Sequence, residues 1–152
     1  MNRSPAETHC FWRDPLFHAA LTGGLLFWLV LYFIQQPSIQ WGWPLLEPWQ
    51  FLLPVVFYPL IEEVIFRGLL QELVHEYISQ GSIGPLSVAN LLTSVVFTAM
   101  HFMTHSPLWA ALVFFPSLVF GFFKDRTGQL PAPILLHVFY NAGFFWLFVT
   151  PV

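Results

Sequence analysis

Three ionisable side chains lie within six positions of one apolar segment. Glu62, Glu63 and Arg67 belong to the run 51–70, which otherwise has the composition of a membrane-spanning helix. A charge near the centre of a bilayer costs about 2.5–3.5 kcal/mol on insertion scales, so residues of this kind are functional candidates. On a helix, Glu63 and Arg67 have i, i+4 spacing and can pair on one face. Glu62 lies about 100° around the axis and is left to face another segment.

Two later apolar segments carry polar side chains at the same helical spacing. Phe97 and His101 stand at i, i+4, and so do His137 and Asn141. Each pair can therefore project from one face of its helix into a bundle. Because ionisable groups are costly to keep in a membrane, a purely structural polar core is the weaker interpretation of the whole set.

These side chains together have the chemistry of a water-activating hydrolase. A carboxylate in a partly dry pocket can act as a general base toward water, and Glu62 is the carboxylate left free. His101 can orient the water or return a proton to a leaving amine. The face with His137 and Asn141 offers N–H donors, which a tetrahedral oxyanion requires. The sequence has no Gly-x-Ser-x-Gly elbow and no His-Glu-x-x-His zinc signature, so we favour direct hydrolysis of a peptide bond.

Three motifs in this order resemble those of the CAAX-protease and bacteriocin-processing (CPBP, or Abi) family of intramembrane proteases: Glu62-Glu63-x-x-x-Arg67, Phe97-x-x-x-His101 and His137-x-x-x-Asn141. The resemblance implies that Glu62 and His101 activate water and that His137 and Asn141 bind the oxyanion. It implies that the second Glu and the Arg of the first motif form a supporting pair. It covers residues 62–141, more than half of the chain.

The resemblance also implies a kind of substrate. We expect a protein or peptide with a hydrophobic or lipidated C-terminal region. In length the chain resembles a short bacterial branch of the family, whose members process substrates with a C-terminal sorting helix. We expect no bound cofactor, although two histidines and a glutamate can in principle hold zinc, and that alternative stays open.

Composition indicates an integral membrane protein. Apolar residues make up 57% of the chain and charged residues 9%, whereas soluble domains carry about 25% charged residues. The mean hydropathy is +0.66. A net charge of −3 without a Lys/Arg cluster gives no basic surface for nucleic acid. Membrane lipids are therefore the expected surroundings. The single cysteine, Cys10, excludes an internal disulfide and a multi-cysteine zinc site.

The hydrophobic pattern predicts an all-α polytopic bundle of about five spans in one domain, residues 1–152. The expected spans are 15–35, 51–70 with a helical continuation to Tyr77, 86–103, 108–123 and 134–149. Three connections are expected to be short turns or tight loops: 79–85, 104–107 and 127–133. Pro54 and Pro59 predict a kink or a break just before Glu62.

Charge placement predicts the orientation of the bundle. A cytoplasmic N-terminus puts four basic residues inside, and the outer loops 36–50 and 104–107 then carry no Lys or Arg. The four are Arg3, Arg13, Lys124 and Arg126. We expect a bacterial inner membrane.

This topology predicts different depths for the motifs. With straight helices, His101 falls near the outer end of its span, Glu62 near the middle and His137 near the inner end. A rise of about 1.5 Å per residue cannot bring these side chains together, so tilt, kinks or shifted helix boundaries are required.

Two other functions remain open at this point. A membrane partner without catalysis, such as an immunity protein against a bacteriocin, would not depend on Glu62 or His101. A proton- or ion-coupled transport element would use the same residue types as a relay. Five spans without an internal repeat are few for a transporter.

Overall fold

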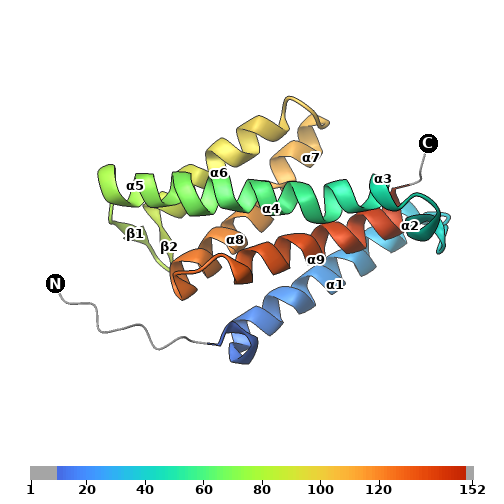
Figure 1. Cartoon of the computed structure of the whole chain (residues 1–152), viewed down its shortest axis with the longest axis horizontal. Helices are drawn as coiled ribbons and strands as arrows, with labels where there is room; N and C mark the ends of the chain where they lie inside the picture. The colour runs from blue at the N-terminus through green and yellow to red at the C-terminus, as the bar shows by residue number, and fades with distance from the viewer. Residues whose placement is uncertain (1–9, 150–152) are drawn as a thin grey trace.

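The computed structural model describes residues 10–149, so the predicted polar segment around Arg3 lies outside the described range. The described chain is mostly helical, as predicted, with one short hairpin of two strands (Figure 1). A 3-10 turn at Phe11–Arg13 precedes the first helix. The single-domain organisation of residues 1–152 stays a prediction.

Helix α1 (Pro15–Gln35) has the predicted boundaries, and local chemistry at its start explains why. Asp14 is the N-cap, and its side chain accepts from the Leu16 backbone N–H. Pro15 occupies the first helical position, where a missing N–H costs nothing. Many large apolar side chains along α1 are exposed, as expected of a helix that faces lipid.

The segment that carries Glu62 forms a continuous helical run over residues 48–77, which includes the predicted continuation to Tyr77 and begins at Pro48 instead of residue 51. It comprises α3 (Pro48–Leu52), the π-helical segment η2 (Leu53–Phe57), α4 (Tyr58–Glu63), the π-helical segment η3 (Val64–Leu70) and α5 (Gln71–Tyr77). A short helix, α2 (Trp43–Leu46), lies within the predicted loop 36–50. The predicted break before Glu62 is therefore absent, and wider turns flank α4 instead.

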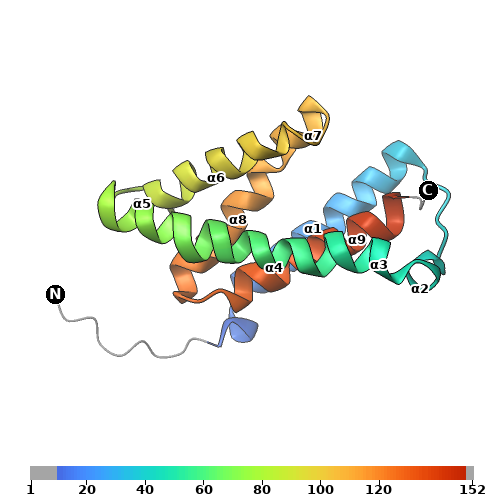
Figure 2. The same ribbon diagram turned by 45° about the horizontal axis from the view of Figure 1, so that its top comes forward.

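A hairpin joins this run to the next helix. Strands β1 (Ser82–Ile83) and β2 (Leu86–Ser87) pair antiparallel, with Ser82 opposite Ser87, where the sequence had indicated only a turn. Helix α6 (Val88–His101) follows and is capped by the Ser87 hydroxyl, which accepts from the Asn90 backbone N–H. Figure 2 shows α6 beside α5 at the hairpin and diverging from α4 towards its other end.

Three more helices complete the described chain. They are α7 (Pro107–Leu112), α8 (Phe114–Thr127) and α9 (Pro131–Phe148). Pro116 explains the bend between α7 and α8, since its ring excludes the normal hydrogen bond to the carbonyl of Leu112. The core cluster lies between α1, α8 and α9 and consists of Phe17, Phe120, Phe123, Ala132 and Leu136.

Among residues 10–149, three helices are long and apolar enough to cross a membrane: Pro15–Gln35, Pro107–Thr127 and Pro131–Phe148. These helices indicate an integral membrane protein. The second of them comprises α7 and α8 together. The predicted count of about five spans is not shown, since α6 is only 14 residues long and the run 48–77 is not among the three.

Charged side chains tie several helix ends together at one end of the bundle. Arg126, near the end of α8, pairs with Asp14 at the start of α1. Lys124 pairs with Glu72 of α5 at 2.5 Å. The same end of the bundle therefore contains the basic residues that the sequence predicts to be cytoplasmic and that the structure describes: Arg13, Lys124 and Arg126.

We predict that the α1–α9 contact depends on Gly143. A Cβ at this position would overlap the Trp28 ring, so Gly143→Val should destabilise the protein by about 1–3 kcal/mol through overpacking. The free energy of unfolding in detergent micelles measures this. Gly23→Ala is the control, since no heavy atom lies within 4 Å of a Cβ there. Equal stability of the Val variant and wild type would contradict the prediction.

Candidate active site

A buried ion pair forms the base of the site. Arg67 Nη1 donates to Glu63 Oε1 at 3.1 Å, which is the predicted i, i+4 pairing, and both side chains are 0% exposed. The guanidinium also lies over two aromatic rings, with Cζ 4.6 Å from the centroid of Phe97 and 5.5 Å from that of Phe120. These rings give the cation a partner on its faces while its edge donates hydrogen bonds. Helices α6 and α8 thus enclose the Glu63–Arg67 pair.

His137 joins the same carboxylate from α9. Its Nδ1 donates to Glu63 Oε1 at 2.8 Å, and its ring stacks on Phe120 at a centroid distance of 4.6 Å. Because Glu63 fixes Nδ1 as the protonated nitrogen, Nε2 is the nitrogen that faces elsewhere. It lies 3.6 Å from Glu62 Oε2. His137 therefore stands between the two carboxylates of the first motif.

Glu62 differs from Glu63 in its access to the outside. The Glu62 side chain is 31% exposed, against 0% for Glu63. Burial thus assigns the two adjacent carboxylates different tasks, since only Glu62 can meet water or a substrate. This agrees with the expectation that Glu62 is the carboxylate left free by the Glu63–Arg67 pair.

His101, the last residue of α6, has one ring nitrogen committed to the backbone. Its Nδ1 donates to the Phe97 carbonyl oxygen at 2.8 Å, and a carbonyl only accepts. In the neutral ring Nε2 is then an acceptor. The Phe97 ring packs against the imidazole at a centroid distance of 4.5 Å, so the pair predicted from spacing is present.

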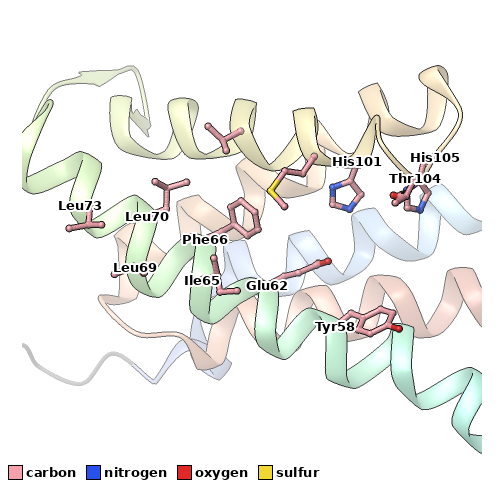
Figure 3. Close-up of a pocket in the computed structure, with 12 residues that line it drawn as sticks. Tyr58, Glu62, Ile65, Phe66, Leu69, Leu70, Leu73, His101, Thr104 and His105 are labelled. Carbon is pink, nitrogen blue, oxygen red and sulfur yellow. Dashed lines mark hydrogen bonds between the residues drawn. The ribbon is translucent and has the colours of Figure 1, made fainter.

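Glu62 and His101 line the same pocket, of about 720 Å³, between the run 48–77 and α6 (Figure 3). The other lining residues are Tyr58, Ile65, Phe66, Leu69, Leu70, Leu73, Val96, Met100, Thr104 and His105. Figure 3 shows the polar residues towards the His101 end and Leu73 at the opposite end. Because many of the apolar side chains are exposed, the pocket is an open groove of mainly apolar character.

Asn141 has a backbone partner on the segment that carries Glu62. Its Nδ2 donates to the Pro54 carbonyl oxygen at 2.8 Å. In a π-helical turn that carbonyl would accept from position 59, where proline has no N–H. Asn141 therefore satisfies the Pro54 carbonyl, which Pro59 leaves without a helical donor. Neither Asn141 nor His137 lines the pocket.

The predicted helical continuation to Tyr77 accounts for the relative depth of Glu62 and His101. The helical run continues to Tyr77, and α6 starts only at Val88 after the hairpin. Glu62 lies 15 positions before the end of the run, and His101 lies 13 positions after the start of α6, about 20 Å. The two side chains therefore line the same pocket from facing helices.

The side chains that could bind a metal ion are not clustered in the described part of the chain. Within the described part of the chain, no three His, Cys, Asp or Glu side chains are grouped so that they could hold one metal ion. The Nδ1 atoms of both motif histidines also have protein partners. The zinc alternative therefore gains no support from the side-chain arrangement.

Sequence reasoning missed two kinds of residue at the site. His105 lines the pocket, with its ring centroid 5.3 Å from that of His101, and its i+4 position could have indicated this. Ser117 contacts Arg67 through its hydroxyl at 2.6 Å and its carbonyl at 2.9 Å. Nothing in the spacing of an isolated serine marks such a contact.

The fold and the site define a helical membrane protein in which a buried cluster of carboxylate, guanidinium and imidazole adjoins an open apolar groove. The family described as Type II CAAX prenyl endopeptidase Rce1-like matches residues 43–143, more than half of the chain. The chain belongs to this family of CAAX prenyl endopeptidases, which confirms the resemblance of the three motifs. No curated protein and no solved structure matches the chain.

We predict that removing one partner of the buried ion pair destabilises the protein. Arg67→Met should lower the free energy of unfolding by about 3–5 kcal/mol, because the buried Glu63 would lose its permanently charged partner and keep only His137. The control is Arg126→Met, which breaks the exposed pair with Asp14 and should cost less than about 1 kcal/mol. Denaturation in detergent micelles compares the two, and equal losses would contradict the prediction.

Proposed function

We propose that the chain is an intramembrane endopeptidase that hydrolyses a peptide bond of a protein substrate with water activated by Glu62 and His101. The observation that carries the proposal is the position of Glu62. Its carboxylate lines the groove that also contains His101. On its other side it lies beside His137, which contacts the buried pair of Glu63 and Arg67. A general base needs this combination of access and fixed geometry.

In the proposed reaction, Glu62 accepts a proton from water while the oxygen attacks the carbonyl carbon of the scissile bond. The C–N bond then breaks, the amine leaves with the proton that Glu62 took up, and the acyl half leaves with a new carboxyl terminus. His101 accepts a hydrogen bond from the same water at Nε2, since Phe97 holds the hydrogen on Nδ1. Two groups thus orient one water molecule.

His137, Glu63 and Arg67 act on Glu62 in this proposal. When His137 is protonated, its Nε2 carries an N–H beside Glu62, and the four groups then sum to zero charge. A neutral cluster reduces the cost of holding charges away from water. The oxyanion role that the family resemblance implies for His137 and Asn141 stays a prediction. In the structure, His137 contacts Glu62 and Glu63, and Asn141 contacts the Pro54 carbonyl.

The groove supports the proposed substrate class. Its apolar portion extends from Ile65 to Leu73 along one wall and suits a hydrophobic or lipidated segment, with the polar end at His101. The scissile bond would then lie at the boundary between apolar and polar parts of the substrate. We further propose a bacterial inner membrane, a cytoplasmic N-terminus and about five crossings, with the run 48–77 and α6 added to the three apolar helices.

Glu62→Gln should abolish hydrolysis without unfolding the protein. The amide keeps the size of the side chain but cannot accept the proton, so kcat should fall by about 10²–10⁴-fold. The control is Glu72→Gln, on the same helical run but outside the pocket and 56% exposed. Cleavage of a membrane peptide with an apolar C-terminal region in proteoliposomes, followed by mass spectrometry, measures the activity.

Wild-type activity of a folded Glu62→Gln variant would reject the proposed mechanism. If both Glu62→Gln and His101→Ala also kept the cellular phenotype, the protein would be a non-catalytic membrane partner, such as an immunity protein. Ion flux in proteoliposomes that depends on Glu62, without cleavage of any peptide, would instead establish the transport alternative.

Removal of metal should leave the activity unchanged. In the proposed route the proton acceptor is a carboxylate, and the described side chains provide no group of three metal ligands. Activity after dialysis against EDTA and 1,10-phenanthroline checks this, with a known zinc protease as the positive control. Loss of activity that added Zn²⁺ restores would show that the reaction depends on metal.

A further inference from the structure

A chain of buried hydrogen bonds connects Arg67 to side chains outside the site, on the side of the guanidinium away from Glu63. Arg67 Nη2 donates to the Ser117 hydroxyl at 2.6 Å. Ser117 Oγ donates to Ser94 Oγ at 2.9 Å, and Ser94 Oγ donates to Asn90 Oδ1 at 3.1 Å. All four side chains are 0% exposed. None of them lines the pocket, and the three beyond Arg67 belong to none of the sequence motifs.

The direction of every bond in this chain follows from the charge at its start. A guanidinium can only donate, so Ser117 must accept from Arg67 and turn its own hydrogen to Ser94. Ser94 must then donate to the Asn90 side-chain oxygen. The Asn90 Nδ2 is left to donate to the Leu118 carbonyl oxygen, at 2.9 Å. The amide and both hydroxyls thus have one orientation each, which a buried network requires for full satisfaction.

Close packing leaves this chain little freedom to move. Helices α6 and α8 approach at Gly121, where a Cβ would overlap the Asn90 Oδ1 atom. Small residues at such contacts allow backbones to come close, and the hydrogen bonds between helices then fix the register. The position of the Ser117 hydroxyl is therefore set by two helices.

We propose that Ser117 and Ser94 are positioning residues for the reaction, acting through Arg67 and Glu63 on His137. The inference rests on the proposed function. Glu63 Oε1 accepts from both Arg67 and His137, so a shift of the guanidinium moves the oxygen that holds the imidazole. That imidazole in turn lies 3.6 Å from Glu62.

Thr93 provides a matched comparison on the same helix. It is 1% exposed, and its hydroxyl has no hydrogen-bond partner in the described part of the chain. Thr93→Val removes a buried hydroxyl of α6 while it keeps the shape of the side chain. If buried hydroxyls contributed only to packing between helices, this change and Ser94→Ala would have similar effects on the reaction.

The first measurement is steady-state hydrolysis in proteoliposomes. Ser117→Ala should lower kcat by about 10-fold or more through misplacement of the catalytic groups, with KM unchanged because Ser117 is outside the groove. Ser94→Ala should lower kcat less and in the same manner. Ser117→Thr restores the hydroxyl and should recover activity, and Thr93→Val should match wild type.

The second measurement needs no substrate. Nitrogen-15 NMR of histidine-labelled protein in detergent distinguishes protonated from unprotonated ring nitrogens, and His137→Gln assigns the His137 signals. Ser117→Ala and Ser94→Ala should shift these signals, whereas those of His18, which bonds the Trp12 carbonyl oxygen, should stay.

The two measurements separate the two hypotheses. Unchanged His137 signals in both serine variants would overturn the positioning role, even if the wild-type protein is a protease. Shifted signals with an unchanged kcat would also overturn it. Shifted signals in a protein that cleaves no peptide would support the coupling of the serines to His137 and reject the proposed function alone.

Discussion

The buried pair of Glu63 and Arg67 is the constraint on which the rest of the structure depends. A carboxylate and a guanidinium with no exposure to solvent must find partners within the protein, since neither water nor lipid can serve them. The partners come from three other helices. Phe97 of α6 and Phe120 of α8 flank the cation, Ser117 of α8 accepts its hydrogen bonds, and His137 of α9 shares the carboxylate. The partners of one ion pair thus bring side chains of α6, α8 and α9 to the segment that carries it.

The difference between two adjacent glutamates illustrates how the fold produces a site. Glu63 is committed to internal partners, whereas Glu62 keeps a partly exposed carboxylate in a groove with His101. The π-helical turns on both sides of α4 contribute to this arrangement, because wider turns change which side chains face the bundle and leave backbone carbonyls free. Asn141 donates to one of these carbonyls, at Pro54, and so joins α9 to the segment that carries the carboxylates.

Some parts of the structure were predictable because they depend on local chemistry. The start of α1 follows from the Asp14 cap and Pro15, and the i, i+4 spacing gave both the Glu63–Arg67 pair and the contact of Phe97 with His101. Other predictions failed because they needed distant contacts. Pro54 and Pro59 predict a break only if no group satisfies the freed carbonyl, and Asn141 lies 87 positions away from Pro54. The hairpin at Ser82–Ser87 was also not predicted, because a turn-rich sequence indicates a turn without specifying that strands pair beside it.

The sequence by itself determined the kind of protein and the chemical groups available to it. Apolar composition requires helices in a membrane, and the three motifs indicate the family, because both depend on residue types and short spacings. Only the tertiary structure decided which carboxylate is accessible, which nitrogen of each histidine is engaged, and that Ser117 and Ser94 support the cation. These properties depend on burial and on distances between helices, and a one-dimensional pattern contains neither.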